Sequence, residues 1–95
     1  MFYVQEIQMV TNQTLVLKAL YWKGKEMTAI EISKDSGLKI KQVYMALYAL
    51  KNMSYIKVRM VPLHYVDGER INNKTFAKLQ NPQLTEKTLQ KRGVL

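Results

Sequence analysis

Cysteine is absent from this chain of 95 residues, and acidic residues are scarce, seven against 15 lysines and arginines. The absence of cysteine excludes disulfide bonds, thiolate metal sites and cysteine nucleophiles, and it agrees with a reducing cytosol. Proline and glycine are also few, and no Pro/Gly-rich linker, repeat or low-complexity segment divides the chain. We therefore expect a single domain over residues 1–95.

Long hydrophobic runs and catalytic motifs are missing as well. No apolar run is long enough to span a membrane, and residues 1–10 carry Glu6 without a basic start, unlike a signal peptide. His64 is the only histidine and has no metal-ligand partner at useful spacing, so we expect a surface or wing-packing role for it. These absences predict a cytoplasmic protein that is not an enzyme, binds no metal or cofactor and makes no membrane contact.

Positive charge dominates what remains, with a formal net charge of +8. No Asp or Glu occurs from Ser36 to Val66, and that span holds Lys39, Lys41, Lys51, Lys57 and Arg59. This distribution favours an anionic partner, most simply nucleic acid. Charge alone fits an ordinary solvated basic surface equally well.

Hydrophobic periodicity predicts helices followed by a pair of strands. Thr28 and Glu31 form a capping box, Ser36-Gly37 permits a sharp turn, and Asp67-Gly68 is typical of a hairpin turn. The expected elements are an N-terminal arm at 1–10, helices at 11–23, 28–35 and 39–52, a wing hairpin at 55–76, and a candidate C-terminal helix at 82–92.

The third helix predicts the core most directly. Its buried stripe is expected to be Val43, Ala46, Leu47 and Leu50. After it, Ile56, Val58 and Met60 alternate with basic residues, as in a half-buried strand, and a return strand is expected at about 70–76. The predicted fold class is mainly α with a small β-hairpin wing (α+β), with a three-helix core plus wing.

The helical stretch contains residue pairs that are typical of one family of DNA-binding proteins. They are Thr28-Ala29, Glu31-Ile32, Gly37-Leu38, Val43-Tyr44 and Ala46-Leu47. With them, Val10 to Ile56 resembles winged helix-turn-helix transcriptional regulators of the broad MarR/ArsR-like kind. The chain departs from that pattern where Lys39 stands near a cap that is often Ser or Thr. Ninety-five residues also leave no room for the long dimerisation helices of full-length MarR proteins. The better likeness is therefore a minimal regulator of the archaeal, phage or archaeal-virus type.

The resemblance implies that the 39–52 helix enters the DNA major groove, and its residues suit that role. Lys39 and Lys41 are expected to contact phosphates at the helix start, and Gln42 and Met45 to contact bases. Tyr44 and Tyr48 carry hydroxyls that can bond phosphate, although Tyr48 could instead pack on the first helix or a second subunit. The alternative for the whole set is a solvated helix face.

The wing supplies the remaining candidates, which are Lys57, Arg59, Arg70 and Lys74. Arg70, just after the Asp-Gly turn, is the best placed for the minor groove or a phosphate. An edge strand protected from aggregation by its charges explains the same residues equally well.

The leading function is thus sequence-specific binding of double-stranded DNA, as a transcriptional regulator. Two alternatives stay open, a winged-helix protein–protein module of a transcription or replication assembly, and a replication or plasmid-maintenance DNA-binding protein. We expect a homodimer, since apolar residues of the arm and of the tail (Leu84, Leu89, Val94, Leu95) exceed what a small core needs. No small-molecule effector is evident in the sequence.

Overall fold

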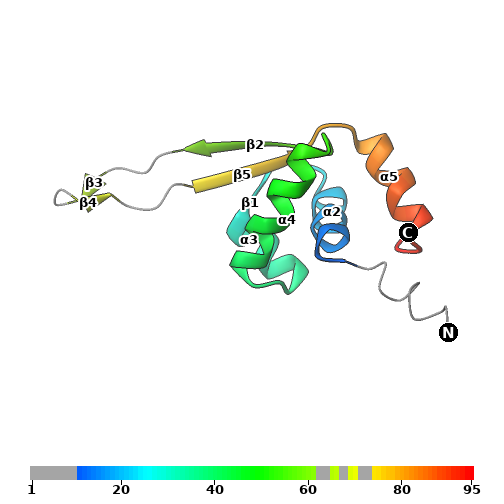
Figure 1. The fold of residues 1–95 in the computed structure, drawn as a ribbon, viewed down its shortest axis with the longest axis horizontal. Coiled ribbons are helices and arrows are strands. Elements are labelled where there is room, and N and C mark those ends of the chain that lie inside the picture. Colours follow the sequence, from blue (N-terminus) through cyan, green and yellow to red (C-terminus); the bar gives the residue numbers. More distant parts are fainter. Residues whose placement is uncertain (1–10, 62–64, 67–68, 71–73) are drawn as a thin grey trace.

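The computed structural model describes residues 11–61, 65–66, 69–70 and 74–95. Within them the chain forms α2 (Asn12–Lys23), β1 (Met27–Thr28), α3 (Ala29–Ser36), α4 (Ile40–Asn52), β2 (Ile56–Val61), β3 (Tyr65–Val66), β4 (Glu69–Arg70), β5 (Lys74–Leu79) and α5 (Pro82–Lys91) (Figure 1). Four helices and a three-stranded antiparallel sheet make a mainly helical α+β fold in this described part. The predicted fold class is confirmed, and the arrangement is compatible with a winged helix-turn-helix.

The described ends of the helices follow from local sequence signals. Thr11 caps α2, and the Thr28–Glu31 capping box opens α3, with Glu31 N–H on Thr28 Oγ1 at 3.1 Å and Thr28 N–H on Glu31 Oε1 at 2.9 Å. Each bond satisfies a backbone donor that the helix itself leaves free. Gly24 ends α2 in the left-handed region, where a glycine has no Cβ to clash.

The sheet has the strand order β1-β5-β2, and β3 pairs with β4 separately. The return strand predicted at 70–76 is wrong in its bounds, because it runs from Lys74 to Leu79. Arg70 belongs instead to β4, where it lies opposite Tyr65. The physical reason is that β5 must reach Met27 of β1 and Ile56 of β2, and such non-local pairing leaves no mark in the local sequence. The arm at residues 1–10, His64 and the Asp67-Gly68 turn lie outside the described residues.

The core lies between α2, α3, α4 and the inner face of the sheet. The predicted α4 stripe of Val43, Ala46, Leu47 and Leu50 is buried in it, together with Leu17, Leu20 and Ile32, Ile56 and Ala77. Burying such side chains supplies most of the free energy that favours folding. The core ends part-way along β2, however.

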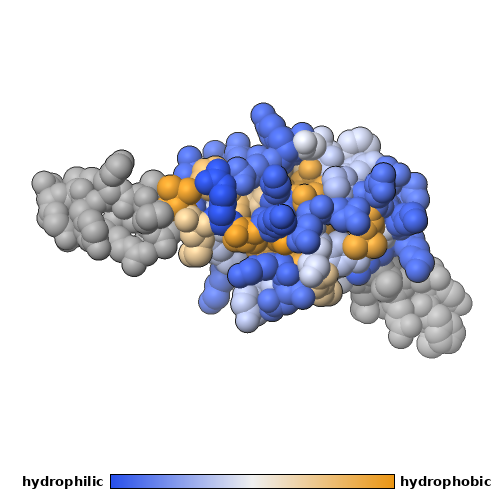
Figure 2. Space-filling model, turned by 90° about the horizontal axis from the view of Figure 1, so that it is seen from above, coloured by the Kyte–Doolittle hydropathy of each residue, from blue (hydrophilic) through white to orange (hydrophobic). Residues whose placement is uncertain are grey.

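Met60 marks that end, because it is 61% exposed although the alternation predicted it to be half-buried. Figure 1 shows β2 and β5 extending away from the helices, so no helix covers the sheet at this level. Seen from above, hydrophobic residues reach the surface there between hydrophilic ones (Figure 2). The strand pair is therefore a stem that carries the wing away from the body.

The C-terminal helix α5 packs against α2. Asn81 caps it, Pro82 stands at its start, and Leu89 is fully buried, whereas Leu84 is exposed. Three side-chain hydrogen bonds tie this end of the chain to the body, from Tyr21 to Glu86 (2.5 Å), between Tyr55 and Thr88 (3.0 Å), and from Arg92 to Thr14 (2.6 Å). Of the apolar tail residues reserved for a dimer, Leu89 and Val94 are thus used by the chain's own core. Among the described helices, none has the length and apolar character that crossing a membrane requires.

Candidate nucleic-acid interface

The turn between α3 and α4 is held rigidly by two serines. Ser36 Oγ donates to Ile32 O at 2.6 Å and accepts Leu38 N–H at 3.2 Å, while Ser33 Oγ donates to Leu38 O at 2.6 Å. Gly37, which follows Ser36, has φ +77°, a backbone conformation that L side chains rarely adopt. Together these contacts set the direction in which α4 leaves α3.

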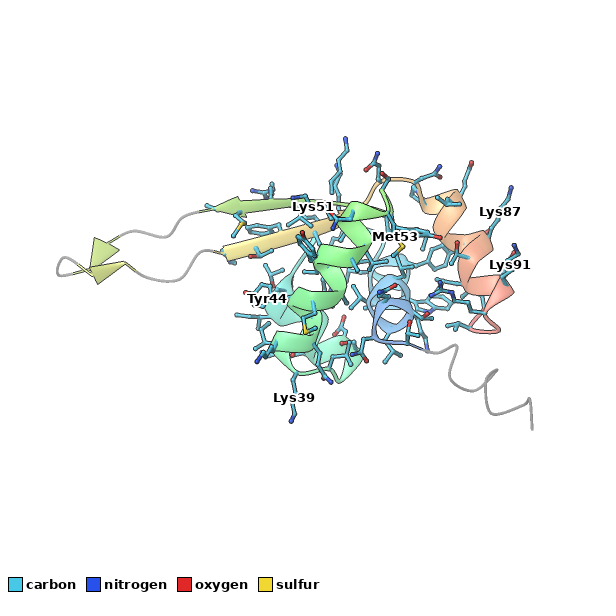
Figure 3. The ribbon with its side chains drawn as sticks, viewed as in Figure 1. Lys39, Tyr44, Lys51, Met53, Lys87 and Lys91 are labelled. Carbon is cyan, nitrogen blue, oxygen red and sulfur yellow. The ribbon has the colours of Figure 1, made fainter. Side chains whose placement is uncertain are left out.

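The outer side of α4 exposes the predicted groove-facing residues. Met45 is 68% exposed, Tyr48 69% and Tyr44 44%, and Lys41 and Lys51 are exposed on the same helix. We call the set Lys39, Lys41, Tyr44, Met45, Tyr48 and Lys51 the α4 face. Lys39, Tyr44 and Lys51 of this set are labelled in Figure 3. No carboxylate occurs anywhere in α4. The expected alternative packing of Tyr48 on the first helix is not what the structure has, because that side chain points to solvent.

Lys39 occupies the N-cap position of α4, with φ −69° and ψ 150°. An ammonium group has no acceptor, so Lys39 cannot cap Gln42 N–H with its side chain, unlike Thr28 at the start of α3. The start of α4 therefore keeps unsatisfied backbone donors beside the exposed side chains of Lys39 and Lys41. Donors and cations converging in this way suit an anion such as a phosphate.

Gln42 also caps the start of α4, a contact that the sequence analysis did not predict. Its Oε1 accepts the backbone N–H of Lys39 at 2.9 Å, and the side chain is half-buried. A bidentate contact with adenine needs both the amide oxygen and the amide nitrogen. In this geometry the oxygen is engaged, so Gln42 offers Nε2 as a donor, which suits an acceptor such as guanine O6 or thymine O4.

The basic residues of the stem lie on the outer face of the sheet. Ile56 and Val58 point to the core, so their neighbours Lys57 and Arg59 point away from it. The same alternation in β5 buries Thr75 and Ala77 and turns Lys74, Phe76 and Lys78 outwards. The Arg70 backbone lies in β4, and its side chain falls outside the described part of the structure.

Arg59 is engaged within the protein. Its guanidinium donates to both carboxylate oxygens of Glu26, at 2.9 and 2.8 Å, and stacks over the Phe76 ring, 4.1 Å from its centroid. Hydrogen bonding from Arg59 holds the pKa of the Glu26 carboxyl below its usual range. Binding of Arg59 to DNA would have to replace this ion pair.

The structure thus divides the predicted site residues into two groups. The α4 face points away from the core on the helical side, because the opposite stripe of α4 is buried. Lys57, Arg59 and Lys74 point away from the same core through the outer face of the sheet. Sequence reasoning missed Lys78 and Glu26, and correct bounds for β5 would have placed Lys78 on the same face of the sheet as Lys74.

Comparison with known proteins locates the fold. No family model matches the sequence, and no curated protein matches it. Among solved structures, the chain is similar to BpsR of Bordetella bronchiseptica, with a TM-score of 0.67 and 16% identity over 95% of this chain and 68% of that one. It is also similar to NadR, with a TM-score of 0.60 and 16% identity over 95% of this chain and 61% of that one.

The BpsR structure concerns regulation of its DNA binding by 6-hydroxynicotinic acid, and NadR is in complex with 4-hydroxyphenylacetate. At 16% identity the likeness shows a shared fold. The expectation that this chain has no small-molecule effector finds no support in these neighbours.

Proposed function

We propose that this protein binds double-stranded DNA and regulates transcription, as a minimal winged helix-turn-helix regulator of the MarR/ArsR-like kind. In this proposal α4 lies in the major groove, and the wing, with Arg70, contacts the backbone or the minor groove. The observation that carries it is the α4 face, which is exposed and free of carboxylates. It lies on the second of two helices, α3 and α4, whose connecting turn is fixed by hydrogen bonds. The fold shared with BpsR, a protein whose DNA binding is regulated by 6-hydroxynicotinic acid, supports the same function.

Within the α4 face the residues have different tasks. Lys39 and Lys41 contact phosphate at the helix start, and Tyr44 and Tyr48 contact phosphate through their hydroxyls. Met45 contacts a thymine methyl group, and the half-buried Gln42, which lies next to the α4 face, donates from Nε2 to a base. A net charge of +8 adds long-range attraction to any duplex.

The test is selection of bound sites from random duplex DNA, followed by a salt titration on the selected site. We expect one enriched sequence and an affinity that falls steeply with salt. Contacts to phosphates release counterions from the DNA, and this release is less favourable when the salt concentration is high. A protein that binds no duplex at low salt contradicts the proposal.

A second candidate is a protein–protein module within a transcription or replication assembly. The observation that favours it is the exposure of Met45 and Tyr48, since Met and Tyr are both enriched at protein interfaces. The substitution Met45→Lys separates the two functions, because an added cation keeps or raises the non-specific affinity for duplex DNA, whereas it disrupts an apolar protein contact. A replication or plasmid-maintenance role uses the same DNA surface, and the location of the selected site in the genome distinguishes it from a repressor.

A further inference from the structure

A groove of about 930 Å³ lies between the end of β5 and the turn that joins α2 to β1. The short strand β1 does not pair with this end of β5. Lys25, Lys57, Arg59 and Lys78 line it together with one acidic residue, Glu26. Leu20 and Tyr21 of α2 form part of its apolar floor. This groove belongs to the sheet side of the molecule and is separate from the α4 face.

The positive charge at this groove is largely unneutralised. Glu26 is committed to Arg59 through two hydrogen bonds. Lys25, Lys57, Lys74 and Lys78, which we call the sheet-side lysines, are all exposed, and none of them forms an ion pair with another described residue. Among the described residues, the sheet side therefore carries four lysines that no carboxylate pairs with, in addition to the paired Arg59.

Two of these lysines occupy positions where their charges destabilise the folded sheet. Lys57 lies directly opposite Lys78 in the β2–β5 register, with both side chains on the outer face. Like charges at directly opposed positions of an antiparallel pair destabilise a sheet. An anion held between the two lysines reverses that effect. The pair is therefore explained by anion binding and not by a contribution to stability.

The extent of the row indicates what kind of anion fits. Lys74 lies opposite Val61, four residues along the strands from the Lys57–Lys78 pair, a separation of about 13–14 Å at the usual rise per residue. A single small anion cannot span that distance. A chain of phosphates can.

We propose that the sheet-side lysines form a second phosphate-binding surface, which takes the backbone of a DNA segment outside the one that contacts α4. The inference rests on the proposed function, since it extends the footprint of a DNA-binding protein. The two surfaces face away from the shared core on different sides, so one straight segment of duplex does not serve both. DNA longer than the α4 site bends around the domain to reach the sheet.

The experiment compares two duplexes that carry the selected site. One ends at the site, and the other extends it by about one helical turn, roughly 10 base pairs, on each side. The variant is Lys57→Gln/Lys78→Gln. The matched control is Lys87→Gln/Lys91→Gln, which removes the same charge from two exposed lysines of α5, on the far side of the body from the stem (Figure 3).

The expected result is that the unmodified protein binds the long duplex more tightly than the short one and that Lys57→Gln/Lys78→Gln abolishes the difference. The slope of log affinity against log salt should fall by about two for the long duplex and stay unchanged for the short one. The control should alter neither slope. Without DNA, the variant should melt at or above the temperature of the unmodified protein, since the opposed like charges are gone.

Each other outcome overturns the proposal. Equal affinity of the unmodified protein for both duplexes, with the variant unchanged, means that the sheet side touches no DNA while the proposed function stands. Equal losses on both duplexes place Lys57 and Lys78 on the α4-bound segment itself. Losses of the same size in the control show an effect of net charge alone. Failure of the unmodified protein to bind either duplex removes both this inference and the proposed function.

Discussion

Gln42 has two proposed contacts that use different atoms of its amide, the helix cap through Oε1 and the base contact through Nε2. The sequence placed it correctly off the buried stripe, but the bond from Lys39 N–H to its Oε1 depends on backbone geometry at the helix start. Without that acceptor the α4 start loses a cap, so Gln42→Ala should lower the free energy of unfolding by about 0.5–1 kcal/mol. The same substitution should relax base preference at one position of each half-site. Chemical denaturation and repeated site selection measure the two effects.

Gln42→Glu separates these tasks, because a carboxylate oxygen still accepts Lys39 N–H while the Nε2 donor is lost. A negative charge in the first turn is also favourable with the helix dipole. We expect Gln42→Glu to be at least as stable as the unmodified protein and to bind DNA more weakly than Gln42→Ala. A selected site that is unchanged in both variants would remove Gln42 from base recognition.

The Glu26–Arg59 pair predicts a pH dependence at the same scale. Hydrogen bonding from Arg59 lowers the pKa of Glu26 in the folded protein, so the pair stabilises the fold above the ordinary glutamate pKa of about 4.3. That contribution is lost as the pH falls through the lowered pKa, because Glu26 is then protonated in the unfolded chain and folding into the ion pair has to remove that proton. In Glu26→Gln the melting temperature should therefore fall less between about pH 5 and pH 3 than in the unmodified protein. The groups are partly exposed, so high salt should shrink the difference. Identical pH profiles for the two proteins would show that the ion pair adds nothing to stability.

At the scale of elements, the sequence predicted what depends on nearby residues. The Thr28–Glu31 box, the Gly37 turn and the Asn81-Pro82 start are each written within a few residues, and the structure has all of them. The bounds of β5 and the exposure of Met60 were wrong because they depend on which strands pair and where the helices stop covering the sheet. Those are properties of the assembled fold.

The start of α4 predicts an exchange of stability against binding. Lys39→Ser supplies the side-chain acceptor that lysine lacks and removes a cation from the positive end of the helix, so the free energy of unfolding should rise by about 0.5–1 kcal/mol. The phosphate contact proposed for Lys39 disappears, and the salt slope for every duplex should fall by about one. Thermal melts and salt titrations on two different sequences measure both. A more stable variant with an unaltered slope would mean that phosphate does not bind at this helix end.

At the scale of the whole molecule, the sequence identified the basic candidate residues but did not predict on which face of the molecule each one lies. Lys41 and Lys57 belong to one acid-free span, yet the fold turns one outwards on α4 and the other outwards on the sheet. Only the position of the common core decides this, because each side chain points away from it. The tail is divided in the same way, with Leu89 inside the core and Leu84 42% exposed.

That exposure leaves Leu84 as the α5 residue best suited to the homodimer expected from the sequence. An exposed leucine next to a buried helix face contributes apolar area to a partner without being needed for folding. Leu84→Lys should leave the free energy of unfolding of the monomer within about 0.5 kcal/mol, as for ordinary surface sites, and should raise the dissociation constant of the dimer. Binding to a duplex with two half-sites should weaken, because a dimer reaches both at once and a monomer does not. Gln83→Lys is the matched control, since it adds the same charge one residue away at another exposed position of the first turn. Sedimentation of the two variants beside the unmodified protein measures association directly. A monomeric unmodified protein that still occupies both half-sites cooperatively would show that the DNA, rather than α5, brings two copies together.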